Sequence, residues 1–170
     1  VYGIAPDLTA LGKISGGGLP VGAVAGKRSV MEVFNGGGLP HGGTFNANPL
    51  TMVAGTATMQ QMTQDAYAEL NALGEFMRQA FHEAFAREGL AAQVTGQSSL
   101  ARLHLTDRAL TNYRSIYPHA EESERMTKLH RHWLEDGFYL SSYGLVCLST
   151  VNTRAEVEAL VDSTIRGLSD

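Results

Sequence analysis

The sequence predicts an α/β protein in two parts, the second of which is a small α+β domain. Residues 33–64 contain no Asp, Glu, Lys or Arg, whereas the helical patterns after residue 65 carry charges on one face. Short apolar runs bounded by glycine lie between those helical patterns and predict strands. The length of 170 residues suffices for one ordinary domain or two small ones. We therefore expect a boundary near residue 65, with residues 1–65 and 66–170 as the two parts.

The first part begins with an extended approach to a lysine and a glycine cluster. Pro6 to Leu11 leads into this turn, and the apolar run from Val21 to Ala25 predicts a buried strand. Ser29 to Phe34 predicts a helical turn, with Ser29 as its cap and Glu32 three residues later. The segment 36–43 holds five glycines and a proline, which predicts a loop.

A helix without a charged face closes the first part. Asn48 is a favourable cap and Pro49 suits a first turn, so we expect a helix from Pro49 to about Met62. Its residues are apolar or small on most faces, which is typical of a buried helix. We therefore expect the segment 33–64 to lie in a protein interior or an interface.

The second part alternates amphipathic helices with short strands. The periodicity predicts a helix over 66–87 that stops at Gly89, and another over 121–135 that ends at Gly137. Residues 93–95 and 100–105 are predicted strands. In the latter, alternation places Leu103 and Leu105 on one face and Arg102 and His104 on the other.

The end of the chain predicts two more strands and a last helix. The segments 138–141 and 145–149 are predicted as strands joined by a turn at residues 142–144. Thr153 and Glu156 have the spacing of a capping box, which opens a helix whose apolar residues face inward. These inward residues are Val157, Leu160, Val161, Ile165 and Leu168.

Composition narrows the class of protein. The net charge of -4, without a basic stripe, argues against a nucleic-acid partner. Cys147 is the only cysteine, which excludes an internal disulfide and favours a reducing compartment. Residues 1–12 lack the pattern of a signal peptide. The uncharged segment 33–64 is too rich in Gly, Asn, Gln and Pro to span a bilayer. We expect a cytoplasmic protein without a membrane partner.

Lys13 is the first candidate catalytic residue. No Asp, Glu, Lys or Arg occurs from Ile14 to Gly26, and desolvation in such a setting favours the neutral, nucleophilic amine. A phosphate-binding P-loop is rejected, because Asp7 stands where it needs glycine and Ile14 where it needs Ser or Thr. A dinucleotide fingerprint fails because Val21 replaces its third glycine.

Residues 6–23 read Pro-Asp-Leu-Thr-Ala-Leu-Gly-Lys-Ile-Ser-Gly-Gly-Gly-Leu-Pro-Val-Gly-Ala. This string resembles the cofactor-lysine segment of class III pyridoxal-phosphate-dependent aminotransferases, and most closely that of glutamate-1-semialdehyde 2,1-aminomutases. The resemblance implies a fold-type I transferase in which Lys13 carries pyridoxal 5'-phosphate as a Schiff base. It also implies that residues 1–65 are the end of the large cofactor domain and 66–170 the small domain. The chain would then be the C-terminal portion of a longer enzyme, inactive by itself.

The block from His41 to Pro49 carries a second resemblance. A threonine that follows two glycines and precedes a helix is placed to donate to a phosphate. Class III enzymes have such a Gly-Thr pair, and its threonine reaches the cofactor phosphate of the neighbouring subunit. The resemblance therefore implies that Gly43 and Thr44 bind the cofactor and that the protein is a homodimer with shared active sites.

The substrate is encoded more weakly. The segment 45–47, Phe-Asn-Ala, departs from the Leu-Ser-Gly of aminomutases, and residues 147–152 lack the substrate-carboxylate arginine of many transaminases. Arg102 and Arg114 are candidate substitutes for that arginine, although a surface charge is the favoured interpretation of both. Mutase and transaminase activity on a small amino acid or amino-aldehyde both remain open. The alternative to an enzyme is a catalytically silent dimerisation or structural piece.

The histidines do not predict a metal site. His130 and His132 lie two apart on a predicted helix and so point in nearly opposite directions. His104 and His119 have no partner at a ligand spacing.

Overall fold

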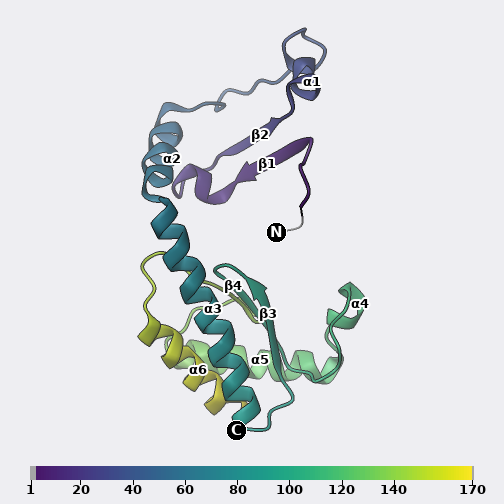
Figure 1. Ribbon diagram of the computed structural model, residues 1–170, viewed down its shortest axis with the longest axis vertical. Coiled ribbons are helices and arrows are strands. Elements are labelled where there is room, and N and C mark those ends of the chain that lie inside the picture. The colour runs from purple at the N-terminus through teal and green to yellow at the C-terminus, as the bar shows by residue number, and fades with distance from the viewer. Residues whose placement is uncertain (1–2, 170) are drawn as a thin grey trace. The chain divides into compact units, whose positions relative to one another are not determined.

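A computed structural model describes residues 3–169 (Figure 1). They form two compact units, of which the first ends at Gln64 and the second begins at Asp65. The first unit holds a hairpin, short helical turns and one longer helix. The second unit holds a three-stranded sheet and its helices.

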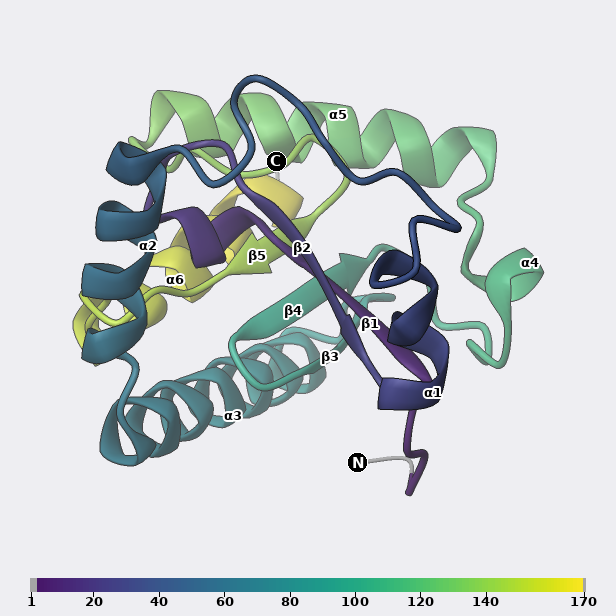
Figure 2. The same cartoon turned by 90° about the horizontal axis from the view of Figure 1, so that it is seen from above.

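The first unit is built on a two-stranded antiparallel hairpin (Figure 2). Strand β1 (Leu8–Gly12) pairs with β2 (Gly22–Gly26). The 3-10 turn η1 (Lys13–Gly16) follows β1 directly. The predicted strand over 21–25 is confirmed with a shift of one residue, but both strands are largely exposed rather than buried.

The helical turn after the hairpin begins one residue earlier than expected. Helix α1 (Arg28–Met31) runs into the 3-10 turn η2 (Glu32–Phe34), and the N-cap position is Lys27, so the prediction of Ser29 as cap is wrong. The hairpin sets this start. The amide of Lys27 donates to the Asp7 carbonyl at 3.0 Å, and its Nζ pairs with the Asp7 carboxylate at 2.6 Å. The Lys27 carbonyl is thereby placed to accept from Val30 and Met31.

Helix α2 (Pro49–Gln61) begins as predicted. The Oδ1 atom of Asn48 accepts from the amides of Leu50 at 3.0 Å and Thr51 at 3.3 Å. The expectation that this helix is buried is wrong within this chain, because only Thr51 and Gly55 are buried. Val53 is 68% exposed. One face of α2 meets the turn η1, and the rest of the small first unit leaves the other faces uncovered.

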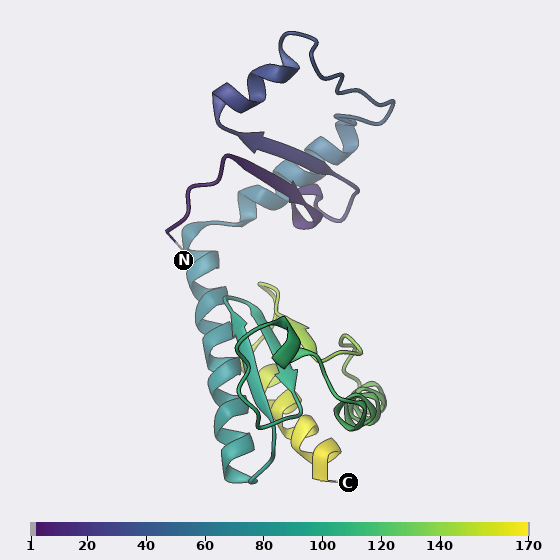
Figure 3. The ribbon, with the colours of Figure 1, turned by 90° about the vertical axis from the view of Figure 1, so that its right-hand side faces the viewer.

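The second unit packs helices onto an antiparallel sheet of order β3-β4-β5. Figure 3 shows α3 and α6 running alongside the sheet and α5 nearly end-on beside it. The elements are α3 (Gln64–Arg87), β3 (Gln93–Gln97), β4 (Leu100–His104), α4 (Tyr113–Ile116), α5 (Ala120–Glu135), β5 (Leu145–Cys147) and α6 (Arg154–Ser169). The predicted helices and the strands over 93–95, 100–105 and 145–149 are therefore confirmed, with ends that differ by up to two residues.

The segment 138–141 is not a strand, and that prediction is wrong. Its backbone closes α5 instead: the amide of Phe138 donates to the Trp133 carbonyl at 2.7 Å, with Gly137 at a φ of 91°. The Leu140 carbonyl then contacts Nε2 of His130 at 3.1 Å. Because these bonds fix the segment against the helix, it is not available to pair with β5.

The last helix starts at the predicted capping box. The amide of Thr153 donates to Oε2 of Glu156 at 2.7 Å, and the amide of Glu156 donates to Oγ1 of Thr153 at 3.3 Å. The core behind it gathers residues from α3, α5, α6 and the sheet. Trp133 and Phe81 are fully buried within it, and Nε1 of Trp133 donates to Oγ1 of Thr164 on α6 at 3.0 Å.

An ion pair between Arg108 and Glu122 fixes the connection between β4 and α5. The guanidinium of Arg108 pairs with both carboxylate oxygens of Glu122, and it donates to the carbonyls of Ser115 at 2.9 Å and Tyr117 at 3.0 Å. Glu122 also accepts from the amide of His119 at 2.7 Å. Chiefly because of the hydrogen bond from Arg108, the pKa of Glu122 is held at about 2, below its ordinary 4.5.

The substitution Glu122→Gln is expected to lower the free energy of unfolding by about 1.5–3 kcal/mol at pH 7. A depressed carboxyl pKa stabilises the fold above the unfolded value, and this contribution is lost as the pH falls. The difference from the unsubstituted chain should therefore shrink between pH 4.5 and about 2. Urea unfolding across this range measures it. The matched control is Glu124→Gln, because Glu124 pairs with Lys128 in solvent. Equal losses in both variants would contradict the prediction.

Candidate functional site

Lys13 opens the turn η1 immediately after β1. Its backbone has a φ of 53°, a left-handed conformation that is uncommon for a residue with a side chain. Lys13 is exposed, so the prediction that its uncharged surroundings desolvate the amine is wrong for this chain. The charge-free residues 14–26 form the turn and the hairpin strand, and they do not cover the lysine.

Lys13 differs from the other two lysines of the chain in its partners. Lys27 pairs with Asp7 at 2.6 Å and Lys128 with Glu124 at 2.8 Å. Lys13 forms no ion pair with any of the residues 3–169.

The turn that carries Lys13 is seated on α2 through close backbone contacts. A Cβ atom at Gly55 would lie 2.3 Å from the Ser15 carbonyl oxygen, and one at Gly17 would lie 2.5 Å from the Ala54 carbonyl oxygen. Both positions therefore need glycine for the turn and the helix to approach this closely. The hydroxyl of Ser15 also donates to the Gly12 carbonyl at 3.1 Å. The backbone around Lys13 is thus fixed by packing although its side chain is in solvent.

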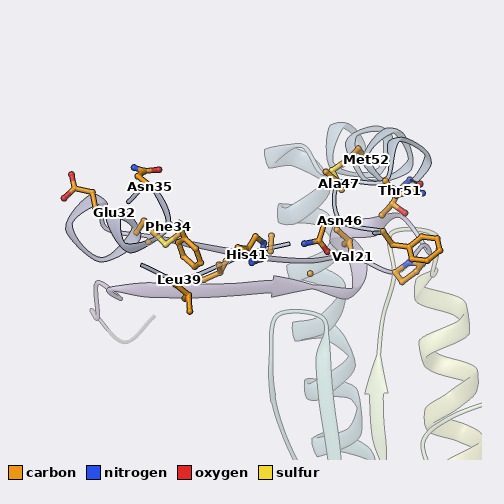
Figure 4. A pocket seen from close by; sticks show the side chains of 18 of the residues that line it. Val21, Glu32, Phe34, Asn35, Leu39, His41, Asn46, Ala47, Thr51 and Met52 are labelled. Atoms are coloured by element: carbon orange, nitrogen blue, oxygen red, sulfur yellow. Dashed lines mark hydrogen bonds between the residues drawn. The ribbon is translucent and has the colours of Figure 1, made fainter. Parts of the chain in front are cut away.

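A cavity of about 1290 Å³ lies in the first unit, between β2, the helical turns α1 and η2, the loop before α2 and the first turn of α2 (Figure 4). On one side the ring of His41 meets the ring of Phe34 edge-on at 5.5 Å. On the other side Asn46 and Thr51 line the cavity. Lys13, Gly43 and Thr44 are not among the lining residues, so this cavity does not bring the predicted site residues together.

Gly43 and Thr44 lie in a tight turn beside that cavity. The amide of Asn46 donates to the Gly43 carbonyl at 3.0 Å, and a Cβ at Gly43 would meet Oδ1 of Asn46 at the same distance. Both residues are exposed. None of the hydrogen bonds within residues 3–169 engages the Thr44 hydroxyl, which leaves it free to donate to a ligand. Phe45, the next residue, is 81% exposed.

The arginines of the second unit are placed differently from one another. The guanidinium of Arg102 lies 5.5 Å from the centre of the Tyr143 ring, and Arg114 is exposed on α4. Sequence reasoning missed Arg108, whose charge is matched by Glu122. No local sequence motif contains both residues. They pair because the connection between β4 and α5 folds back onto α5.

Two histidines of the second unit lie near polar side chains. Nε2 of His104 lies 2.9 Å from the Thr95 hydroxyl, and His132 lies 3.8 Å from the Asp136 carboxylate. His104 is buried, although alternation placed it opposite Leu103. Across residues 3–169, no three His, Cys, Asp or Glu side chains gather as metal ligands would. In the same range, no helix combines the length and apolar character needed to cross a bilayer.

Comparison with known proteins places these features in a family. The family model described as "Aminotransferase class-III" matches residues 1–161. Glutamate-1-semialdehyde 2,1-aminomutase from Chlorobium luteolum is 39% identical over 165 residues, which are 95% of this chain and 38% of that protein. The chain spans about 40% of the length of the curated relatives it matches.

Solved structures agree with this result. An omega-transaminase from Sphaerobacter thermophilus superposes with a TM-score of 0.94 at 43% identity, covering 99% of this chain and 39% of the transaminase. A transaminase with PLP bound superposes with a TM-score of 0.84 at 33% identity, covering 98% of this chain and 39% of that protein. The expected fold, that of a PLP-dependent transferase with a mixed helix and sheet C-terminal portion, is therefore confirmed. With its family match over nearly the whole length, the chain belongs to the class III aminotransferases.

Proposed function

We propose that this chain is the lysine-bearing C-terminal portion of an enzyme that transfers amino groups with pyridoxal 5'-phosphate. The observation that carries the proposal is the family match over residues 1–161, which includes the glycine-flanked lysine. The boundary between the units at residues 64 and 65 supports the assignment of residues 1–65 to the large domain and 66–170 to the small domain.

The residues around Lys13 suit a covalent cofactor anchor. Its amine is accessible, has no carboxylate partner among residues 3–169, and stands on a backbone that Gly55 and Gly17 hold in place. An aldehyde cofactor needs such an accessible amine, which must lose its proton in order to react. Pyridoxal phosphate, when bound, supplies the aldehyde and the electron-accepting ring. Lys13 would hold the cofactor through its amine and, once released, would serve as the base that takes the proton from the substrate α-carbon.

Gly43 and Thr44 are proposed to contact the cofactor phosphate across a subunit boundary. The hydroxyl of Thr44 can donate a hydrogen bond to a phosphate oxygen. Thr44 does not line the cavity of its own unit, which agrees with a contact to a phosphate bound in the neighbouring subunit. The exposed side chains of Phe45, Leu50 and Val53 add apolar surface near this turn. Such surface is typical of a contact region, so we propose a homodimer.

The substrate is proposed to be a small amino acid or amino-aldehyde. Relatives named aminomutase and transaminase lie at comparable identities, 39% and 43%. The residues Phe45 to Ala47 depart from the aminomutase pattern, and this favours transfer between two molecules over transfer within one. An assay with separate amino donors and acceptors, run beside one with glutamate-1-semialdehyde alone, distinguishes the two activities.

Borohydride trapping tests the cofactor anchor. The complete polypeptide that contains this chain is incubated with pyridoxal phosphate, reduced with borohydride and digested. The masses of its peptides are then measured by mass spectrometry. We expect the added mass on the peptide with Lys13, whereas Lys27 and Lys128 serve as internal controls because each is ion-paired. Equal labelling of all three lysines, or no label, would favour the alternative of a silent dimerisation or structural piece.

A further inference from the structure

The second unit contains a separate small cavity where its sheet ends. β5 pairs with β4 only over residues 100–102, and the last bond runs from the amide of Leu103 to the carbonyl of Gly144 at 2.9 Å. Beyond that point the chain turns away at Gly144, with a φ of 79°. This leaves a cavity of about 180 Å³ between β4, the turn at residues 142–143 and α5. Typical pockets for drug-sized ligands hold ~300–1,000 Å³, so this one suits a smaller molecule.

One cation at this cavity lacks a counter-charge. Arg108 and Glu122 both line it, and they neutralise each other through a double hydrogen bond. Arg102 also lines it, yet among residues 3–169 its guanidinium forms no hydrogen bond and no ion pair. Its Nε atom is buried, and the group lies over the ring of Tyr143 at 5.5 Å. The cavity thus offers the outer edge of one unpaired guanidinium, the edge that binds a carboxylate with two hydrogen bonds.

His104 also lines the cavity, and its ring adds little positive charge at pH 7. His104 is buried, and its Nε2 lies 2.9 Å from the Thr95 hydroxyl. Burial first, and then the charges of Arg102 and Arg108, lower the pKa of His104 from 6.5, so its ring is mainly neutral at pH 7. The charge of Glu122 opposes this lowering in part.

Part of the remaining wall is apolar, and the rest carries the hydroxyl side chains of Thr106, Ser123, Thr127 and Ser142. Leu105, Ile116 and Met126 line the cavity together with Arg102. These three apolar side chains can pack against a few methylene or methyl groups. A ligand that satisfies both regions has one negative charge at one end and a short apolar chain at the other.

We propose that this cavity binds a small monocarboxylate with a short aliphatic chain, whose carboxylate pairs with Arg102 while its chain packs on Leu105, Ile116 and Met126. This site lies entirely within the second unit, and it requires neither Lys13 nor the proposed amino-group transfer. Its failure or success is therefore independent of the proposed function.

Nuclear magnetic resonance with butyrate as the probe tests the site. The buried Nε–H of Arg102 is protected from solvent, so its signal is expected to be observable and to shift on binding at the outer guanidinium edge. We expect that signal, and the ring signals of His104, to shift saturably with butyrate and to be unaffected by butyramide, its neutral counterpart. Equal shifts with both compounds, or no saturable shift, would overturn the proposal on the unsubstituted chain alone.

Two variants sharpen the assignment. Arg102→Gln is expected to weaken butyrate binding about tenfold or more, since a charge-assisted contact is lost, as followed by the His104 signals. Arg87→Gln is the matched control, because Arg87 is exposed, pairs with its neighbour Glu88 and does not line the cavity. Unchanged binding in Arg102→Gln, or an equal loss in Arg87→Gln, would refute the role of Arg102.

Discussion

Replacing Lys13 by alanine is expected to reduce turnover of the complete enzyme by a factor of at least about 10³, because one change removes both the proposed covalent anchor and the proposed base. The measurement is the rate of amino-group transfer at saturating donor and acceptor. Visible absorbance of the bound cofactor should change in the same variant, since the bond to Nζ can no longer form.

Two further lysine variants separate chemistry from charge. Lys13→Arg keeps the positive charge, but a guanidinium titrates above ~12 and does not act as an amine nucleophile, so it should be as inactive as alanine. Lys27→Ala removes the other lysine of the first unit, which is ion-paired with Asp7, and should retain turnover. Normal turnover in Lys13→Ala would refute the mechanism.

Truncation of the only tryptophan is expected to have the largest effect on stability. Trp133 is fully buried between α5 and α6, and its Nε1 donates to Thr164. Trp133→Ala leaves a cavity and removes the hydrogen bond that the Thr164 hydroxyl accepts, while that hydroxyl still donates to the Leu160 carbonyl at 2.7 Å. Chiefly because of the cavity, we expect a loss of about 3–5 kcal/mol in the free energy of unfolding. Urea unfolding followed by far-ultraviolet circular dichroism measures the loss, because the variant has no tryptophan fluorescence.

The control for this truncation keeps an aromatic ring but removes the hydrogen bond to Thr164. Trp133→Phe should lose less than Trp133→Ala, since most of the apolar contact is retained. If Trp133→Ala cost less than about 1 kcal/mol, the core described for the second unit would be wrong.

Local signals in the sequence predicted most of the secondary structure. Asn48 with Pro49, and Thr153 with Glu156, determine helix starts through contacts within a few residues, and both starts were correctly predicted. The segment 138–141 failed because its backbone is held by Trp133 and His130 from the preceding helix. The apolar pattern of residues 138–141 gives no information on these contacts with the preceding helix.

The sequence proposed residues for the candidate site, but it did not predict their environment. Lys13 was identified from the order of its neighbours, yet an absence of charge nearby in sequence did not place the amine away from water. The apolar composition of α2 likewise suggested burial, whereas its exposed faces depend on what the first unit supplies to cover them. Arg102 was noted from the sequence, but its lack of a counter-charge depends on Glu122 being taken by Arg108.

The contact between Gly55 and Ser15 has an evolutionary consequence. The position of the Lys13 turn depends on main-chain atoms contributed by a helix that is distant in sequence. A side chain acquired at residue 55 would require a compensating rearrangement of the turn, so the two segments are free to diverge only as a matched pair.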